Sequence, residues 1–267
     1  MLTERQQEIV AIAVAEGGVG VDELAIRFTV TPQTIRRDLN ALCDRGLLAR
    51  NHGGARPLNS VANVGYDDRH ASHAAEKRRI GLAAAMLIAP RTSLIINIGT
   101  TTEQVARAIY DHRDLVVITN NINVVNILSG SPAKELILAG GVVRQTDGGV
   151  VGEAAVEFIR QFRVDLAVIG ASAVEEDGAV LDYDIREVSV ARAIIENARK
   201  TMLVFDHSKF ERRANVRICD IDQVDLVVTD REPSARFRSR CERGSVEIVV
   251  AEDGASKAIE AKEQAYG

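Results

Sequence analysis

The chain has few cysteines, and their spacing suits neither a disulfide framework nor a zinc site. Cys43, Cys219 and Cys241 are odd in number, lie far apart and form no C-x-x-C pair. No segment approaches the roughly 20 apolar residues that a membrane-spanning helix needs. The first residues also lack the charged-then-apolar pattern of a signal peptide. We therefore expect a protein of the reducing cytoplasm that has no membrane partner.

Two common nucleotide-binding motifs are absent as well. The sequence contains no G-x-x-x-x-G-K-[ST] segment, which would form a P-loop, and no G-x-G-x-x-G segment, which would bind a dinucleotide. We expect no cofactor. The 267 residues are 46% hydrophobic with a mean hydropathy of −0.02, which is typical of a globular chain with a small and a larger domain.

The segment TPQTIRRDLNAL predicts a helix that begins at Pro32. Thr31 is a suitable N-cap, and proline suits the first helical position because its missing N–H has no partner there in any case. At about 100° per residue, Ile35, Leu39 and Leu42 share one face of this helix. One face therefore packs against a core, and the opposite face presents long hydrogen-bonding side chains.

Two further helices are expected before this one. The segment RQQEIVAIAVAEGG has apolar residues at helical spacing and stops at Gly17–Gly18, and VDELAIRF begins a short helix capped by Asp22. Helix, helix, turn and helix is the order of a helix-turn-helix, whose later helix enters the DNA major groove. The next segment, GLLARNHGGA, predicts a short hairpin or wing whose glycines permit a tight turn beside a phosphate.

Positive charge is concentrated in this part of a chain whose formal net charge is −5. From Arg27 to Arg56 there are six arginines and two acids, a local net charge of +4, so the remainder carries −9. A basic head on an acidic body favours a protein that binds DNA phosphates at one end only. The candidate DNA-binding residues are Thr31, Pro32, Gln33, Thr34, Arg36, Arg37, Asn40, Arg50, His52, Gly53 and Gly54.

From residue 91 onward, continuous apolar segments alternate with helical patterns, as in SLIINIG followed by TTTEQVARAIY. This alternation predicts an α/β domain with a mostly parallel sheet covered on both faces. The fold class is therefore α/β, with a small all-α winged helix-turn-helix head. The expected boundaries are a head at 1–57, a linker at 58–75, an α/β body at 76–252 and a flexible tail at 253–267.

Polar residues follow several of the predicted strands, where ligands of such sheets bind. At Gly99 to Thr102 a strand runs into a helix start, so free backbone N–H groups and the positive helix end suit a phosphate. A threonine-rich helix cap without a ligand is the alternative for this loop alone. The candidate small-molecule-binding residues are Gly99, Thr100, Thr101, Thr102, Asn120, Asn121, Gly140, Gly141, Arg144 and Lys209.

Other polar residues add weaker candidates. Asp147, Asp182 and Asp184 lie in expected loops, where their carboxylates are able to accept from ligand hydroxyls. His70 and His73 would share one helical face, which raises the alternative of a metal site. Two histidines without a further ligand are more often surface residues, so we expect no metal.

These motifs resemble the DeoR family of bacterial transcription regulators. The segment TPQTIRRDLNAL followed by RNHGGA is similar to the family's DNA-binding head. The segments IGTTTEQVA, VITNN, LAGGVVR, DGGVVGEAAVEFI and DHSKF are similar to its effector domain, whose fold is related to sugar-phosphate isomerases. The resemblance covers Leu2 to about Val250, and the polar tail beyond has no counterpart in the family.

The resemblance implies a role for each set of residues. The side chains of the helix beginning at Pro32 would enter the major groove, while Arg50 and His52, with the glycines after them, would contact the DNA backbone or minor groove. The phosphate of a small effector would bind at residues 99–102, with Lys209 in the same pocket.

The function implied is that of a repressor without enzymatic activity. It would bind double-stranded operator DNA of glycerol and glycerol-3-phosphate metabolism genes and be released by a phosphorylated effector, glycerol-3-phosphate. A repressor answering to another sugar phosphate is the alternative, and a sugar-phosphate isomerase is less favoured because such an enzyme has no use for a helix-turn-helix. Two operator half-sites require two heads, so we expect a homo-oligomer, a dimer at least and a tetramer by resemblance.

Overall fold

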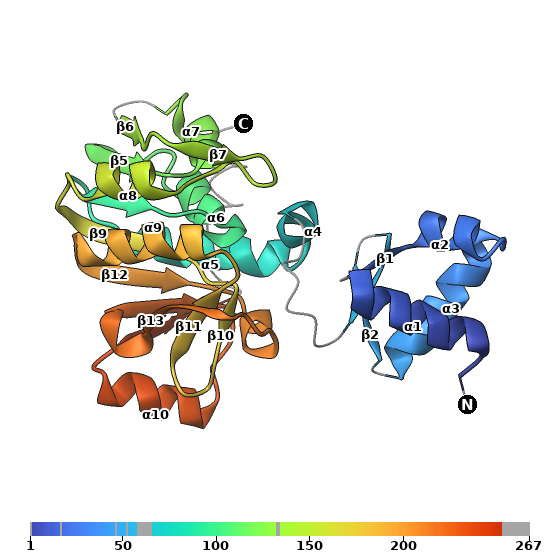
Figure 1. The fold of residues 1–267 in the computed structure, drawn as a ribbon. Helices are drawn as coiled ribbons and strands as arrows, with labels where there is room; N and C mark the ends of the chain where they lie inside the picture. The colour runs from blue at the N-terminus through green and yellow to red at the C-terminus, as the bar shows by residue number, and fades with distance from the viewer. Residues whose placement is uncertain are drawn as a thin grey trace, which may run out of the picture. The chain divides into compact units, whose positions relative to one another are not determined.

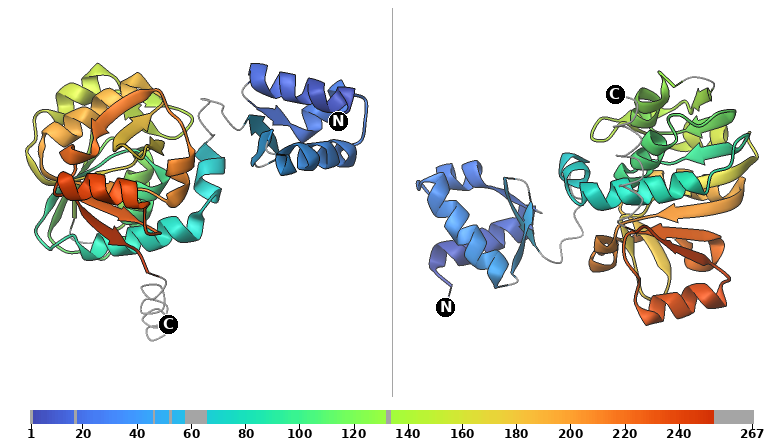
Figure 2. Two further views of the ribbon diagram at one scale, coloured as in Figure 1. Left: turned by 90° about the horizontal axis from the view of Figure 1, so that it is seen from below. Right: turned by 180° about the vertical axis from the view of Figure 1, so that it is seen from behind.

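The computed structural model describes residues 2–16, 18–45, 47–51, 53–57, 66–131 and 134–252. The chain divides into two compact units, residues 1–64 and 65–267 (Figures 1 and 2). His52, residues 58–65 of the expected linker and the expected tail at 253–267 lie outside the described residues. No helix in the described part of the chain is both long and apolar enough to cross a membrane.

The described residues of the first unit form three helices and three short strands. They are α1 (Glu4–Glu16), β1 (Val19–Gly20), α2 (Val21–Arg27), α3 (Pro32–Asp44), β2 (Leu48–Asn51) and β3 (Gly54–Pro57). The strands form an antiparallel sheet in the order β1–β3–β2. The head expected to be all-α therefore also contains a sheet, because the connection between α1 and α2 adds a strand to the predicted wing.

The sequence prediction for α3 is confirmed in detail. The helix begins at Pro32, and the Thr31 side chain accepts a hydrogen bond from the backbone N–H of Thr34 at 3.3 Å. Ile35, Leu39 and Leu42 are fully buried in the core of the first unit.

The predicted cap of α2 was wrong. The N-cap is Gly20, the last residue of β1, and Asp22 lies inside the first turn. The backbone N–H of Val21, which begins the helix, donates to the carbonyl of Gly53 in the wing at 2.8 Å. Because the wing takes over one of the free N–H groups, this helix start depends less on a side-chain cap.

The second unit is built on a seven-stranded sheet in which every neighbouring pair is parallel. Its strands are β4 (Ser93–Ile96), β5 (Leu115–Thr119), β6 (Lys134–Leu138), β9 (Val164–Ile169), β12 (Ala198–Val204), β14 (Leu226–Thr229) and β15 (Glu247–Val250). The order across the sheet is β15–β14–β12–β9–β4–β5–β6. The predicted parallel α/β fold is confirmed.

Helices cover both faces of this sheet, as Figures 1 and 2 show. They are α4 (Tyr66–Ala71), α5 (Ala74–Met86), α6 (Thr100–Ala108), α7 (Ile122–Leu128), α8 (Glu153–Ile159), α9 (Ile185–Glu196) and α10 (Ala235–Arg243). Leu94 and Ile96 of β4 pack in one hydrophobic cluster with α5, α6 and α7, whereas Ile95 packs in another with α8, α9 and α10. Alternate strand residues thus serve opposite faces, which explains the uninterrupted apolar segments in the sequence.

Smaller elements surround the sheet. A hairpin is formed by β7 (Val142–Arg144) and β8 (Gly149–Val151), and a three-stranded sheet by β10 (Ala173–Val174), β11 (Ala179–Asp182) and β13 (Val216–Asp220). Two 3₁₀-helices, η1 (His207–Glu211) and η2 (Ile221–Gln223), follow β12 and β13. The helix α4 belongs to the second unit and lies in the segment that the sequence analysis assigned to the linker.

The chain reverses its direction of travel across the sheet between β4 and β9. From β4 it proceeds through β5 to β6 at one edge, and it then continues from β9 through β12 and β14 to β15 at the other. In open parallel sheets, the carboxyl ends of the two strands at such a reversal diverge and leave a crevice for a ligand. The fold therefore directs attention to the residues that follow β4 and β9.

Candidate functional site

The head presents a polar face on α3, opposite the face that packs in the core. Gln33, Arg36, Arg37 and Asn40 are exposed, and Thr34 is half-buried. These side chains come from the first two and a half turns of the helix, the part that meets base edges in a helix-turn-helix complex. The structure thus gathers most of the predicted DNA-binding side chains on one accessible surface.

Arg50 connects the wing to α3 rather than extending freely. Its guanidinium donates to the carbonyl of Arg36 at 3.1 Å and to that of Gly54 at 3.5 Å, and it also donates to the side-chain oxygen of Asn40. Two predicted DNA-binding residues, Arg50 and Asn40, are therefore paired with each other. In this arrangement Arg50 fixes the position of β2 beside the helix.

A buried acid holds α3 in the head. Asp38 is 7% exposed and accepts from Arg5 Nε at 2.7 Å and from Gln6 Nε2 at 3.0 Å, both on α1. Charge-assisted hydrogen bonds of this kind restrain geometry more than neutral ones do. The exposed face of α3 is thus carried by a helix whose inner side is tied to its neighbour.

In the body, a cleft opens at the reversal of strand order. Its cavity volume is about 20 Å³, room for about one water molecule. Its lining residues are Arg69, Ile98, Gly99, Thr100, Thr101, Gly170, Ala171, Ser172, Asp182, Glu187 and Lys209. Residues 98–101 follow β4 and residues 170–172 follow β9, so the cleft lies where the fold predicts a ligand site.

The amino end of α6 forms one wall of this cleft. Gly99 is the N-cap with φ of +149°, a conformation that favours glycine, and it provides no side-chain cap. Thr100 and Thr101 are buried in the cleft wall. The Thr102 hydroxyl instead donates to the carbonyls of Asn97 and Gly99, each at 2.8 Å, and holds the loop in shape.

Two cationic side chains face the same space. Lys209, on η1 after β12, is 6% exposed. Burial, together with repulsion from Arg212, lowers the pKa of Lys209 to about 7. Arg69, on α4, is the second cation of the cleft. An anion placed here would restore the charged state of the lysine, since a nearby negative charge raises the pKa of an amine.

The other wall carries acidic and hydroxyl groups. Asp182 accepts from the Ser172 hydroxyl at 3.0 Å and from the backbone N–H of Tyr183 at 2.6 Å. Burial raises the pKa of Asp182, and burial together with repulsion from Asp182 raises that of Glu187 to about 7. The cleft is thus divided into a cationic end and an end rich in hydrogen-bond acceptors.

Arg144 does not line the cleft but stands behind it among three carboxylates. Its guanidinium donates to Asp147 at 2.6 and 2.9 Å, to Asp184 at 3.1 Å and to Glu187 at 2.5 Å. Asp147 and Asp184, predicted as hydroxyl acceptors, therefore have a cation as their partner. The arginine holds Glu187, a lining residue, in place.

The remaining predicted small-molecule-binding residues lie outside the cleft lining. The side chain of Asn120 donates to the carbonyl of Val150 at 3.1 Å, and that of Asn121 caps α7 and donates to Glu103 at 3.2 Å. Gly140 and Gly141 lie in the connection between β6 and β7. The structure thus brings Gly99, Thr100, Thr101 and Lys209 together and places the other predicted residues outside the cleft lining.

The two histidines do not share a helical face. His70 is in α4, whereas His73 precedes α5 in a left-handed conformation with φ of +53° and contacts the His207 ring edge to face at 5.2 Å. Among the described residues, no group of three or more potential metal ligands is assembled.

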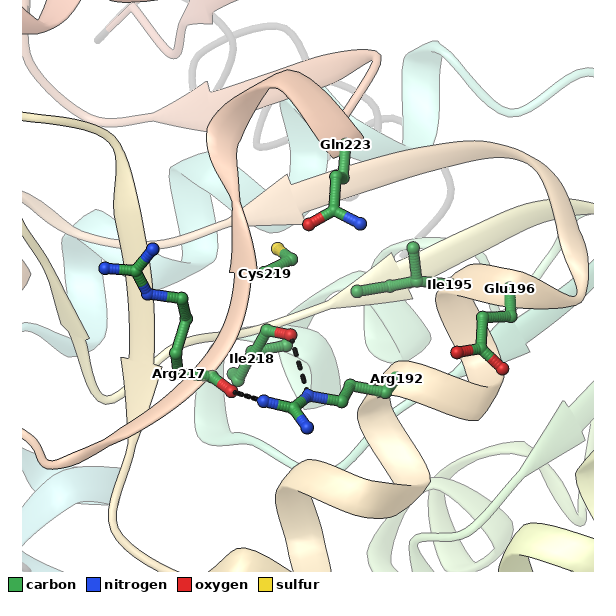
Figure 3. A pocket seen from close by; sticks show the side chains of 7 residues that line it. All are labelled: Arg192, Ile195, Glu196, Arg217, Ile218, Cys219 and Gln223. Carbon is green, nitrogen blue, oxygen red and sulfur yellow. Dashed lines mark hydrogen bonds between the residues drawn. The ribbon is translucent and has the colours of Figure 1, made fainter.

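A second hollow lies between α9 and β13 (Figure 3). It is lined by Arg192, Ile195, Glu196, Arg217, Ile218, Cys219 and Gln223. Arg192 donates to the carbonyls of Arg217 at 2.6 Å and Ile218 at 3.2 Å, and Arg217 pairs with Asp220. Its cations are thus already committed to protein partners, which makes it a weaker candidate than the cleft.

Sequence reasoning missed several residues of the cleft. Arg69 was placed in the linker, and Glu187 was not singled out because it lies within a regular helix. Gly170 and Ser172 follow β9 in a polar strand end, so the signal that pointed to residues 99–102 was present there too.

A winged helix-turn-helix on one unit and a cleft at the strand-order reversal of the other are the two parts of a ligand-responsive transcription regulator. Residues 5–61 match the DeoR-like helix-turn-helix domain, and residues 72–231 match the DeoR C terminal sensor domain. The chain belongs to the DeoR family, as its motifs predicted. It is a transcriptional repressor of that type and not an enzyme.

Individual relatives agree with this assignment. The chain is 46% identical over 231 residues to the glycerol-3-phosphate regulon repressor of Escherichia coli (strain K12), which covers 86% of this chain and 92% of that protein. It is 36% identical over 251 residues to the HTH-type transcriptional repressor CsqR of the same organism, over 94% and 96% of the two chains. Among solved structures, ribose 5-phosphate isomerase A of Methanocaldococcus jannaschii is 15% identical, with a TM-score of 0.39 over 52% of this chain and 55% of that one.

The cluster around Arg144 yields a stability prediction. Replacing Arg144 by methionine removes the shared counter-charge of Asp147, Asp184 and Glu187. Because breaking a buried charge pair leaves its partners uncompensated, we expect the free energy of unfolding to fall by about 3 to 5 kcal/mol. Urea denaturation followed by circular dichroism measures this. The matched control is Arg160→Gln, whose ion pair is solvent-exposed and should contribute less than about 1 kcal/mol. Equal losses in both variants would contradict a structural role for Arg144.

Proposed function

We propose that this protein is a cytoplasmic repressor of glycerol and glycerol-3-phosphate metabolism genes, and that glycerol-3-phosphate bound in the cleft releases it from operator DNA. The observation that carries the proposal is the cleft itself, which combines a helix amino end with Lys209 and Arg69 at the strand-order reversal. The identity of 46% to a repressor named for this regulon supports the choice of effector.

The chemistry of the cationic end suits a phosphate. The first N–H groups of α6 have no partner within the helix, and the helix dipole adds about half a positive charge at this end. Arg69 adds a full charge within a buried setting, where electrostatic attraction is less screened than in water. Lys209, whose pKa burial lowers to about 7, regains its charge beside an anion. A dianionic phosphate is therefore favoured over an uncharged sugar.

The opposite wall suits the hydroxyl groups of a small polyol. Asp182, Glu187 and Ser172 supply oxygens within the same cleft. A sugar phosphate other than glycerol-3-phosphate is the alternative effector.

Release of DNA follows from thermodynamic linkage. An effector that binds the DNA-free arrangement more tightly than the DNA-bound one must weaken operator affinity by the same factor. A coupling free energy of about 2 to 3 kcal/mol corresponds to a loss of roughly 30- to 150-fold. Because one head reads one half-site, the proposal includes a homo-oligomer, a dimer at least and a tetramer by family resemblance.

Loss of a base-reading side chain tests the DNA interface. Arg37→Ala removes an exposed guanidinium from α3, and we expect operator affinity to fall by about 1 to 3 kcal/mol while affinity for the effector is unchanged. Fluorescence anisotropy with operator DNA at fixed salt measures the first quantity, and calorimetry the second. The control Arg160→Ala removes an equal charge from the body surface. If both variants lowered affinity equally, general charge and not a groove contact would be responsible.

A negative charge placed at the amino end of α6 tests the effector site. In Thr101→Glu a carboxylate occupies the position proposed for the phosphate, so we expect a repressor that binds operator normally but is no longer released. The readout is operator anisotropy with and without glycerol-3-phosphate. Ser189→Glu adds the same charge at an exposed position of α9 and should respond as the unmodified protein does. Normal release of the Thr101→Glu variant would refute the phosphate assignment.

A further inference from the structure

Arg69 occupies an unusual position for a residue so near the boundary between the two units. It lies on α4, the first helix of the second unit, and its side chain is 12% exposed where it lines the cleft with Thr101 and Lys209. Its Nε is buried without a hydrogen-bond partner among the described residues. A buried donor without a hydrogen bond costs free energy. The Nε–H group of Arg69 would therefore gain from donating to an acceptor that enters the cleft.

The hydrogen bond between the Arg69 side chain and Asp147 is easily broken. Arg69 Nη2 donates to Asp147 Oδ2 at 3.2 Å, a single long bond. The same carboxylate is held by Arg144 through two shorter bonds, at 2.6 and 2.9 Å. If Arg69 turned away, Asp147 would keep a bidentate cation and would not become an uncompensated buried charge.

We propose that Arg69 is a binding residue for the anionic group of the effector, and that its exchange of Asp147 for that group is the step that couples the cleft to α4. The inference rests on the proposed function and adds to it the residue that senses the phosphate from outside the sheet. The planar guanidinium offers Nε and one Nη as a fork for two phosphate oxygens. The β4 loop and Lys209 approach the same space from other elements.

Hydrogen bonds at both ends of α4 fix the position of this helix. The carbonyl of Arg69 accepts from Lys77 Nζ and from the Ser72 hydroxyl. One turn earlier, Tyr66 donates to Glu103 Oε2 at 2.8 Å and accepts from Asn123 Nδ2 at 3.0 Å.

The hydrogen bond between Tyr66 and Glu103 connects α4 to α6. Glu103 belongs to α6, whose amino end forms the cleft wall. Burial and the hydrogen bond to Glu103 raise the pKa of Tyr66, so its phenol remains a donor at neutral pH. A change at Arg69 therefore acts on a short helix that is otherwise fixed to α6. Of the helices in the second unit, α4 is the first after the head in the sequence.

The test uses the full chain with two ligands. Inorganic phosphate, titrated by calorimetry, probes the anion site independently of effector identity, and glycerol-3-phosphate probes release of operator DNA. We expect Arg69→Gln to weaken phosphate binding roughly 10- to 100-fold. Arg69→Lys keeps the charge but loses the fork, so its affinity should be intermediate. Arg160→Gln is the control and should bind phosphate normally.

A second variant separates sensing from binding. Tyr66→Phe removes both phenolic hydrogen bonds but leaves the cleft lining intact. We expect its phosphate affinity to stay within about threefold, whereas saturating glycerol-3-phosphate should weaken operator binding at least about fivefold less than in the unmodified protein. A merely structural role for Tyr66 would not alter this ratio while leaving both affinities intact.

Each contrary outcome has its own meaning. Phosphate binding by Arg69→Gln equal to that of the unmodified protein would overturn the inference, as would failure of the unmodified protein to bind phosphate. If Arg69→Gln does not fold, unchanged phosphate affinity in Arg69→Lys would overturn the bidentate contact. Full coupling in Tyr66→Phe would overturn transmission through α4. Arg69-dependent phosphate binding without release by glycerol-3-phosphate would support the inference and refute the proposed effector.

Discussion

The arrangement of the body depends on one constraint, the reversal of strand order between β4 and β9. Because the chain leaves these adjacent strands in opposite directions, their carboxyl ends stay uncovered, and residues 98–101 and 170–172 line a common cleft. Every other feature of the site is placed relative to this opening. The amino end of α6 supplies backbone donors, η1 supplies Lys209, and α4 supplies Arg69 from outside the sheet.

Buried charge in the cleft is kept balanced by neighbours rather than by solvent. Arg144 pairs with Asp147, Asp184 and Glu187 behind one wall, and Arg69 and Lys209 are the cations that line the opening. An entering dianion would pair with these two cations, whereas an uncharged molecule would not. The same principle operates in the head, where Asp38 pairs with Arg5 inside and the exposed face of α3 keeps its own arginines for a partner.

Local signals made much of this predictable from the sequence. The cap at Thr31 and the spacing of Ile35, Leu39 and Leu42 defined α3, since both depend only on residues within two turns. The polar strand ends identified the loop at 99–102 and Lys209. What the sequence could not supply were pairings between distant segments. Arg69 lines the cleft although it lies 30 residues before Gly99 in the chain, and Arg144 pairs with carboxylates up to 43 residues away. The carbonyl of Gly53 in the wing accepts a hydrogen bond from the first backbone N–H of α2.

The most direct test of the account is fluorescence anisotropy of the full chain at fixed salt, with DNA from upstream of glycerol-uptake and glycerol-3-phosphate dehydrogenase genes. Glycerol-3-phosphate is titrated against fructose phosphates. The account predicts specific binding that glycerol-3-phosphate weakens roughly 30- to 150-fold and fructose phosphates leave intact. Specific binding released only by another sugar phosphate would refute the effector, and an absence of specific binding would contradict the repressor function proposed for these genes.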